Sequence, residues 1–140
     1  MKVLLAADGS DYTVKALHFI AANKHALEID GELLVIHVQM GLPTGFNLVM
    51  GFEEAQKLHT TEADDVFTPL QKFLGDHGMT CRCVSKIGPI VQEIVELAKK
   101  EQVHMIVMGT HGRDLIGRAV MGSVAQKVVA QSDVPVLLVK

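Results

Sequence analysis

The sequence lacks several features that would assign it to common functional classes. It has no apolar run long enough to span a bilayer, and Asp8 interrupts the apolar start of the chain well short of the apolar core of a signal peptide. We therefore expect a cytoplasmic protein that does not associate with membranes. The formal net charge is −3 at pH 7, so the chain has no excess of positive charge to attract nucleic acid.

Cysteine is also scarce, since the chain contains only Cys81 and Cys83. The two lie two positions apart in an expected strand, so their side chains point to the same face, which is a poor geometry for a mutual disulfide. We expect both thiols to be reduced. A Cys-x-Cys pair can bind a metal or sense an oxidant, but no second pair of Cys or His follows at the spacing of a zinc finger.

Motifs of common catalytic sites are missing as well. The sequence has neither the lysine-containing loop of a Walker A motif nor the Gly-x-Ser-x-Gly elbow of a serine hydrolase. None of the seven histidines forms a metal-ligand pair on one expected helix. His37 and His111 are expected near one crevice, but no acid or nucleophile partner can be identified for either. We therefore predict no catalytic residue and no metal site, and efficient catalysis is not expected.

What the chain does contain is a regular alternation of strand-like and helix-like segments. Its 140 residues, of which 49% are hydrophobic, suit one domain that needs neither disulfides nor metal. The expected strands are 2–7, 32–38, 80–86, 103–108 and 136–139. The expected helices are 11–27, 53–77, one that begins with Pro89 at its first position, and 123–131. This alternation predicts an α/β fold with a five-stranded, parallel, doubly wound sheet and helices on both faces.

The most informative segment follows the fourth expected strand. Gly109-Thr-His-Gly112 comes directly after it, and nine residues later Gly122-Ser123 opens the last expected helix. Glycines accept positive φ and let an anion approach backbone N–H groups, and a helix start offers unpaired N–H groups and the positive end of its dipole. Ser123 and Gln126 also have the spacing of a capping box with Ser123 as N-cap. The segment therefore predicts a phosphate-binding cradle.

Two polar residues beside this cradle have alternative roles. Arg113 can pair with a phosphate through its forked guanidinium, or it can be a solvated loop arginine. Asp8, at the end of the first expected strand, can brace the turn or cap the following helix with its side chain. The residues themselves leave these alternatives open.

The glycine segment, in the form MGTHGRDLIGRAVMGSVAQKV, resembles the nucleotide-binding signature of the universal stress protein family, Gly-x2-Gly-x9-Gly-(Ser or Thr). Segments 3–10, 36–38, 87–89 and 134–139 resemble that family too, so the likeness covers nearly the whole chain. It implies one universal stress protein domain over residues 1–140 with the Rossmann-like strand order 3-2-1-4-5. It also implies that Asp8 lies at the nucleoside and that the backbone of Val38 lies near adenine.

This resemblance, to the ATP-binding branch of the family, implies a stress-response or regulatory protein that binds an adenine nucleotide, with or without Mg²⁺. Two alternatives stay open: an interaction module that responds to AMP or cyclic AMP, and a slow ATP hydrolase. A homodimer through the last strand is also implied, and it would protect an exposed sheet edge. The candidate nucleotide-binding residues are Ala6, Ala7, Asp8, Val38, Met108, Gly109, Gly112, Arg113, Gly122, Ser123 and Val124.

Residues 40–52 form an apolar segment that contains glycines and shows no clear periodicity. Such a segment is too apolar for a freely solvated loop. It can be a lid over the nucleotide, part of a dimer contact, or a stretch packed locally on the second helix. The sequence does not separate these three interpretations.

Overall fold

The computed structural model describes residues 1–27, 29, 33–41, 51–112 and 121–140. The strands within them are β1 (Val3–Ala6), β2 (Leu33–Gln39), β3 (Cys81–Ile87), β4 (Met105–Gly109) and β5 (Val136–Val139). The helices are α1 (Asp11–Ala22), α3 (Phe52–Asp76), α4 (Ile90–Lys100) and α5 (Ser123–Gln131). Strands and helices alternate along the chain, as the sequence predicts.

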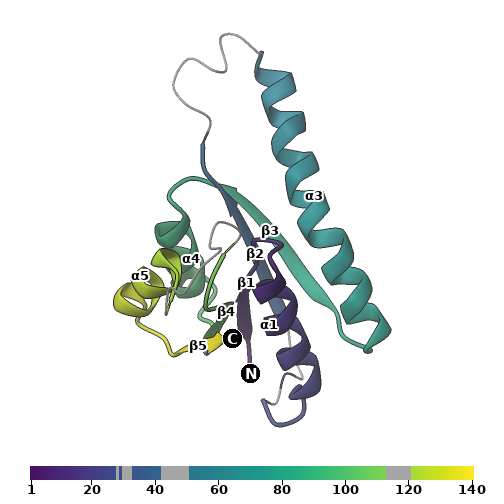
Figure 1. Cartoon of the computed structure of the whole chain (residues 1–140), viewed down its shortest axis with the longest axis vertical. Helices are drawn as coiled ribbons and strands as arrows, with labels where there is room; N and C mark the ends of the chain where they lie inside the picture. Colours follow the sequence, from purple (N-terminus) through teal and green to yellow (C-terminus); the bar gives the residue numbers. More distant parts are fainter. Residues whose placement is uncertain (28, 30–32, 42–50, 113–120) are drawn as a thin grey trace.

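The strands form one parallel sheet in the order β3-β2-β1-β4-β5 (Figure 1). The predicted α/β fold and strand order are therefore confirmed. β1 lies between β2 and β4, with Ala6 opposite both Ile36 and Met108. The order reverses at β1, so the carboxyl ends of these three strands form the switch point at which α/β folds bind ligands.

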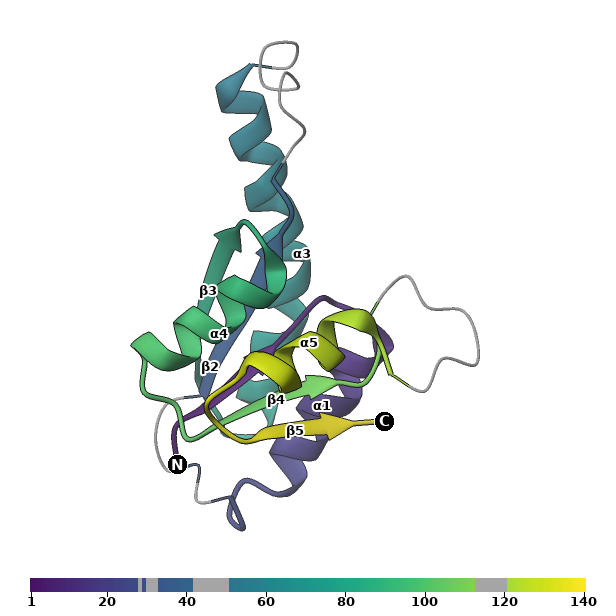
Figure 2. The ribbon, with the colours of Figure 1, turned by 90° about the vertical axis from the view of Figure 1, so that its left-hand side faces the viewer.

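Helices cover both faces of this sheet. α1 and α3 pack against Val3 and Leu5 on one face, and α4 and α5 pack against Leu4 on the other. Figure 2 shows α4 and α5 in front of the strands, with α1 and α3 behind them. Because successive strand residues point to opposite faces, a strand covered on both sides must be continuously apolar, as β1 is.

Helix boundaries differ from the prediction at three helices, and α3 is displaced by one residue at each end from the expected 53–77. α1 ends at Ala22 and residues 23–27 form turns, so it is shorter than the expected helix 11–27. Pro89 is the N-cap of α4 and not its first residue, because its ψ of 111° is extended. Such shifts are small, and both helices still pack on the sheet, α1 on one face and α4 on the other.

α3 extends past the carboxyl end of β2 (Figure 1). Gln39, the last residue of β2, is buried and donates from its Nε2 to the carbonyl oxygen of His59 at 2.8 Å. Its Oε1 also makes a hydrogen bond with His59 Nδ1. These contacts join the N-terminal third of α3 to the carboxyl end of β2. The interpretations offered for residues 40–52 fall mainly on 42–50, which lie outside the described residues.

An ionic cluster ties α4 to the strands at their amino ends. The Oε2 atom of Glu101 lies 2.6 Å from Arg82 Nη2 and 2.7 Å from Lys2 Nζ. The hydrogen bond from Arg82, and then that from Lys2, lower the pKa of Glu101 to about 2. The cluster therefore joins the C-cap of α4 to β3 and to the residue before β1.

Cys81 and Cys83 share one face of β3, as predicted, and both thiols are free, with their Sγ atoms 3.7 Å apart. Burial raises the pKa of both thiols, to about 12 for Cys83. Among the residues that the structure describes, no helix has the length and apolarity to cross a bilayer. The same residues contain no group of three or more His, Cys, Asp or Glu arranged to hold a metal ion.

Candidate functional site

A cleft of about 720 Å³ opens at the carboxyl ends of β1, β2 and β4. This volume lies within the range of small-molecule sites. All of the candidate residues from the sequence except Arg113 line the cleft. Arg113 lies outside the described residues. Its contact with a phosphate therefore stays a prediction, and a solvated loop arginine is the alternative.

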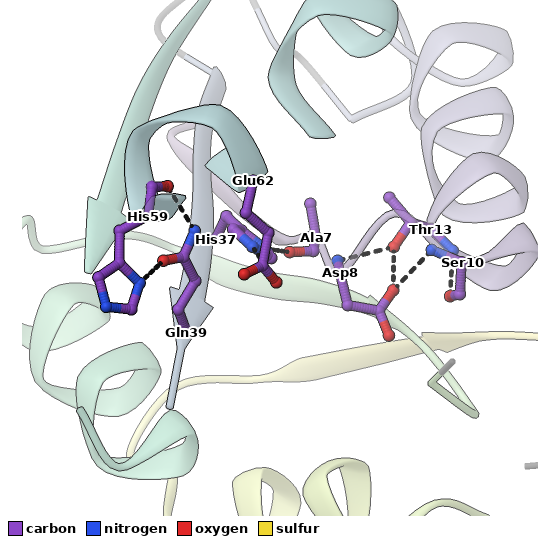
Figure 3. A network of polar contacts seen from close by, with 8 residues as sticks. All are labelled: Ala7, Asp8, Ser10, Thr13, His37, Gln39, His59 and Glu62. Atoms are coloured by element: carbon purple, nitrogen blue, oxygen red, sulfur yellow. Dashed lines mark hydrogen bonds and ion pairs between the residues drawn. The ribbon is translucent and has the colours of Figure 1, made fainter. Parts of the chain in front are cut away.

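Asp8 follows β1, and the turn into α1 orients its carboxylate (Figure 3). Oδ1 accepts hydrogen bonds from the Ser10 N–H at 3.0 Å and from the Thr13 hydroxyl at 2.7 Å. The Asp8 N–H donates in turn to Thr13 Oγ1 at 3.1 Å. Asp8 therefore braces the turn, while Ser10 is the N-cap of α1. The other oxygen, Oδ2, faces Gly112, where an added Cβ would lie 2.8 Å from it.

The glycines that follow β4 allow close packing. A Cβ on Gly109 would lie 3.0 Å from the carbonyl carbon of Tyr12 and still closer to its Cβ, so glycine lets β4 end directly against α1. Gly112 allows the same close approach to Asp8. Neither glycine has a positive φ. Close approach, and not the positive φ that the sequence suggested, is therefore what requires glycine at these positions.

Thr110 joins the two glycine segments. It is buried, and its N–H donates to the carbonyl oxygen of Val139 in β5 at 2.9 Å. Its own carbonyl oxygen accepts a hydrogen bond from the Gly122 N–H at 2.7 Å. These bonds place the start of α5 beside the end of β4, so both glycine segments border the same cleft.

The N-cap of α5 is Gly122, and no side chain caps the helix. The predicted capping box is therefore wrong, because Ser123 is the first helical residue and the Ser-x-x-Gln spacing falls one position late. Gln126 Nε2 instead donates to the carbonyl oxygen of Met121 at 3.0 Å. Ser123 keeps its place in the cleft but does not act as a cap.

The first helical hydrogen bond of α5 runs from the Gln126 N–H to the Gly122 carbonyl oxygen at 3.1 Å. The N–H groups of Ser123, Val124 and Ala125 consequently precede any acceptor within the helix. All three residues line the cleft, beside the positive end of the helix dipole. This arrangement suits a bound anion.

Apolar side chains form the wall of the cleft on the α4–α5 face of the sheet. They come from β2, β4 and the two helices, and they are Ile36, Val38, Ile90, Ile94, Met108 and Val124. A wall of this kind suits a flat, largely apolar ring. The cleft thus combines an anion site with an apolar slot.

The wall on the α1–α3 face is polar (Figure 3). His37 is 3% exposed, and its Nδ1 lies 2.8 Å from the carbonyl oxygen of Ala7. Its Nε2 has no hydrogen-bond partner within the described part of the chain and lies 4.0 Å from Glu62 Oε1. His111 also lines the cleft, with its ring on Tyr12 at 4.9 Å between centroids. Both histidines are therefore at the crevice, as the sequence predicts.

The sequence did not single out Thr13, Gln39 and Glu62, which also line the cleft. Thr13 could have been found from its position in the first turn of α1, from which a hydroxyl can reach back to Asp8. Gln39 and Glu62 carry no comparable signal, because α3 meets the end of β2 only in the folded chain.

The chain matches the universal stress protein family over residues 1–140. A universal stress protein of Thermus aquaticus is 33% identical over 138 residues, which cover 99% of this chain and 97% of that protein. The solved structure of protein MJ0577 of Methanocaldococcus jannaschii has a TM-score of 0.83 at 29% identity, covering 99% of this chain and 94% of that one.

Two more distant solved structures contain nucleotides. One is a universal stress protein from Archaeoglobus fulgidus in complex with dAMP, with a TM-score of 0.73 at 20% identity, covering all of this chain and 98% of that one. The other is a universal stress protein in complex with cAMP, with a TM-score of 0.65 at 22% identity, covering all of this chain and 97% of that one. At these identities the likeness establishes a shared fold.

Proposed function

The chain belongs to the universal stress protein family, and from this premise we propose that it binds an adenine nucleotide at the switch point of its sheet. The observation that carries the proposal is the meeting of an anion site and an apolar slot in one cleft. The N–H groups at the start of α5 suit phosphate, and the wall that contains Val38 and Met108 suits a purine ring. A nucleotide has these same two parts.

The proposal gives each part of the nucleotide its own set of residues within a single domain, residues 1–140. The phosphates are assigned to Gly109, Gly112, Arg113, Gly122, Ser123 and Val124. The base and ribose are assigned to Ala6, Ala7, Asp8, Val38 and Met108. Asp8 suits the nucleoside because its carboxylate, already oriented by Thr13, can accept a hydrogen bond from a hydroxyl or amino group.

ATP is our proposed ligand, because donors on both glycine segments can follow a chain of phosphates across the cleft. Mg²⁺ would accompany it on phosphate oxygens and water, with few protein ligands. AMP and cyclic AMP are the alternative ligands, since distant proteins with this fold hold dAMP and cAMP. We propose a regulatory use of the bound nucleotide, and slow hydrolysis ranks behind it because the sequence has no Walker A lysine.

We also propose that the protein is a cytoplasmic homodimer that associates through β5. The position of β5 at the end of the strand order supports this, because an edge strand offers unpaired backbone groups to a second copy.

Substitution of the first residue of α5 tests the anion site. Ser123→Pro removes one N–H donor while preserving the helix, because proline is favoured at this position and Gly122 already has the extended ψ of 151° that a following proline requires. We expect the affinity for ATP to fall by roughly ten- to a hundredfold, since a hydrogen bond to a charged group is lost. Titration calorimetry on nucleotide-free protein measures this loss.

Ser123→Ala is the matched control, because it removes the hydroxyl and keeps the N–H. It should lose less affinity than Ser123→Pro. Equal ATP affinity in the proline variant and the parent protein would show that the phosphates do not lie at the start of α5.

A further inference from the structure

The proposed function leaves one buried polar atom of the cleft unexplained. His37 Nε2 is buried and has no hydrogen-bond partner within the described residues, although its ring lines the cleft. A buried polar atom without a partner costs free energy, so native proteins seldom retain one without a use. His37 follows Ile36 and precedes Val38, and its side chain therefore lies on the opposite face of the sheet from the apolar wall.

The hydrogen bond on the other side of the ring determines what Nε2 can do. The Ala7 carbonyl oxygen can only accept a hydrogen bond, so His37 Nδ1 must carry the proton that joins them at 2.8 Å. In the neutral ring, Nε2 then presents a lone pair. In that form Nε2, buried beside the cleft that His37 lines, is a hydrogen-bond acceptor.

A second acceptor lies opposite the first. Glu62 Oε1 is 4.0 Å from His37 Nε2, and the Glu62 side chain is 45% exposed, so it borders both the cleft and solvent. One amino group can donate to two acceptors at this separation, at about 2.9 Å from each. Because His37 Nε2 is buried, the partly exposed Glu62 side chain must turn aside to admit such a group. An amino group has two hydrogens and can donate to both acceptors, whereas a hydroxyl group has one and can donate to either of them.

The backbone around this pair is fixed by Gln39. Its side chain is buried and bonds to both the carbonyl oxygen and the ring of His59, which lies one turn of α3 before Glu62 (Figure 3). Gln39 is thus a positioning residue, because it sets the separation between β2, which carries His37, and α3, which carries Glu62. The two acceptors therefore form a built subsite.

We propose that His37 Nε2 is a specificity-determining acceptor that, together with Glu62, receives a hydrogen bond from a donor group of the bound nucleotide. This inference rests on the proposed function. Away from its phosphates, an adenine nucleotide offers such donors in two places, the 6-amino group of the base and the hydroxyl groups of the ribose. Both sources supply the same chemistry, and ligand analogues distinguish them.

Two substitutions of His37 separate the acceptor from the structural hydrogen bond. His37→Asn places an amide near the position of Nδ1, where it can still donate to the Ala7 carbonyl oxygen, but it removes the acceptor at Nε2. His37→Gln places an amide near Nε2 and gives up the bond to Ala7. The readout is the ratio of the affinity for ATP to the affinity for an analogue that lacks one donor group. A loss of stability alone does not change this ratio.

The ligands are ATP, inosine triphosphate, which lacks the 6-amino group, and 2′-deoxy-ATP and 3′-deoxy-ATP, which each lack one hydroxyl. We expect the parent protein to bind ATP about tenfold more tightly than the analogue that lacks the recognised donor. This ratio should fall toward one in His37→Asn and persist in His37→Gln. The analogue that shows the effect identifies the donor as the base or the ribose.

Glu62→Gln gives an independent test on a partly exposed side chain whose replacement does not endanger folding. Its amide can donate to His37 Nε2 and so occupy the acceptor, which should again lower the ratio toward one. The inference is overturned if the parent protein does not discriminate, or if His37→Asn and Glu62→Gln discriminate as strongly as the parent. Failure of the parent protein to bind any of these nucleotides would instead refute the proposed function.

Discussion

Asp8 shows how one side chain can serve both the fold and the cleft. One carboxylate oxygen holds the turn after β1 through Ser10 and Thr13, and the other faces Gly112. Glycine at position 112 is what allows the carboxylate to lie there. At the scale of single residues, the geometry of the cleft therefore depends on the absence of a side chain as much as on the presence of one.

Gly112→Ala tests this dependence. The new Cβ would lie 2.8 Å from Asp8 Oδ2, so the carboxylate must move away. We expect ATP affinity to fall by about tenfold, since the nucleoside loses a well-placed acceptor, while the free energy of unfolding falls by less than about 1 kcal/mol because the end of a side chain can adjust. Calorimetry and urea unfolding measure the two effects.

Gly75→Ala is the matched control, because Gly75 lies in α3 and nothing is within 4 Å of its added Cβ. Alanine should raise the free energy of unfolding by about 0.5–1 kcal/mol through its higher helix propensity, and ATP affinity should be unchanged. Unaltered ATP binding in Gly112→Ala would show that the orientation of Asp8 does not matter to the ligand.

At the scale of elements, apolar patterning predicted the strands and helices of the described residues, because the central strands bury continuous apolar runs and the helices pack apolar residues against the sheet. The edge strands β3 and β5 are only partly buried. The start of α5 was less predictable. Both Gly122 and Ser123 are acceptable N-caps, and the choice depends on the hydrogen bond between the Gly122 N–H and the Thr110 carbonyl oxygen. That bond forms only when α5 lies against the end of β4.

Glu101 provides a prediction about how elements are joined. Its pKa falls from an ordinary value of 4.5 to about 2 in the folded protein, because Arg82 and Lys2 bond to its ionised form. A depressed pKa contributes stability above the unfolded value and loses it as pH falls through the folded value. The contribution should therefore be complete above about pH 5 and disappear between about pH 4.5 and 2.

Urea unfolding of the parent protein and of Glu101→Gln, measured from pH 2 to 7, tests this prediction. Near neutral pH the parent should have a higher free energy of unfolding than Glu101→Gln. The plots of this free energy against pH should converge for the two proteins at acid pH. Because salt screens the charges of Glu101, Arg82 and Lys2, 1 M NaCl should reduce the difference in stability between the two proteins. A difference that stays constant down to pH 2 would show that ionisation of Glu101 does not stabilise the fold.

At the scale of the whole molecule, the cleft is assembled from segments that are distant in the sequence. The glycine segments and Asp8 could be placed beside it from their motif and from the strand order. The polar wall could not, because Glu62 reaches the cleft only where α3 passes the end of β2, and the unpaired state of His37 Nε2 depends on the bond between its Nδ1 and Ala7. Sequence periodicity contains no information about either contact.

Association is also a property of the whole molecule. The mass of one chain is 15.2 kDa. If β5 pairs with a second copy, light scattering at micromolar protein concentration should give twice that mass. Leu138→Pro should lower that mass to the monomer value, because proline removes a backbone donor that faces the open edge. The carbonyl oxygens of Pro135 and Val139 bond to β4, so in a strand the N–H of Leu138 points away from β4. A monomeric mass for the parent protein would contradict the proposed dimer.

Calorimetric titration of the nucleotide-free protein with ATP shows whether the chain binds an adenine nucleotide. We expect saturable binding of one ATP per chain in the cleft at the ends of β1, β2 and β4. The absence of saturable binding to ATP, and also to AMP and cyclic AMP, by the folded protein would contradict the proposed function.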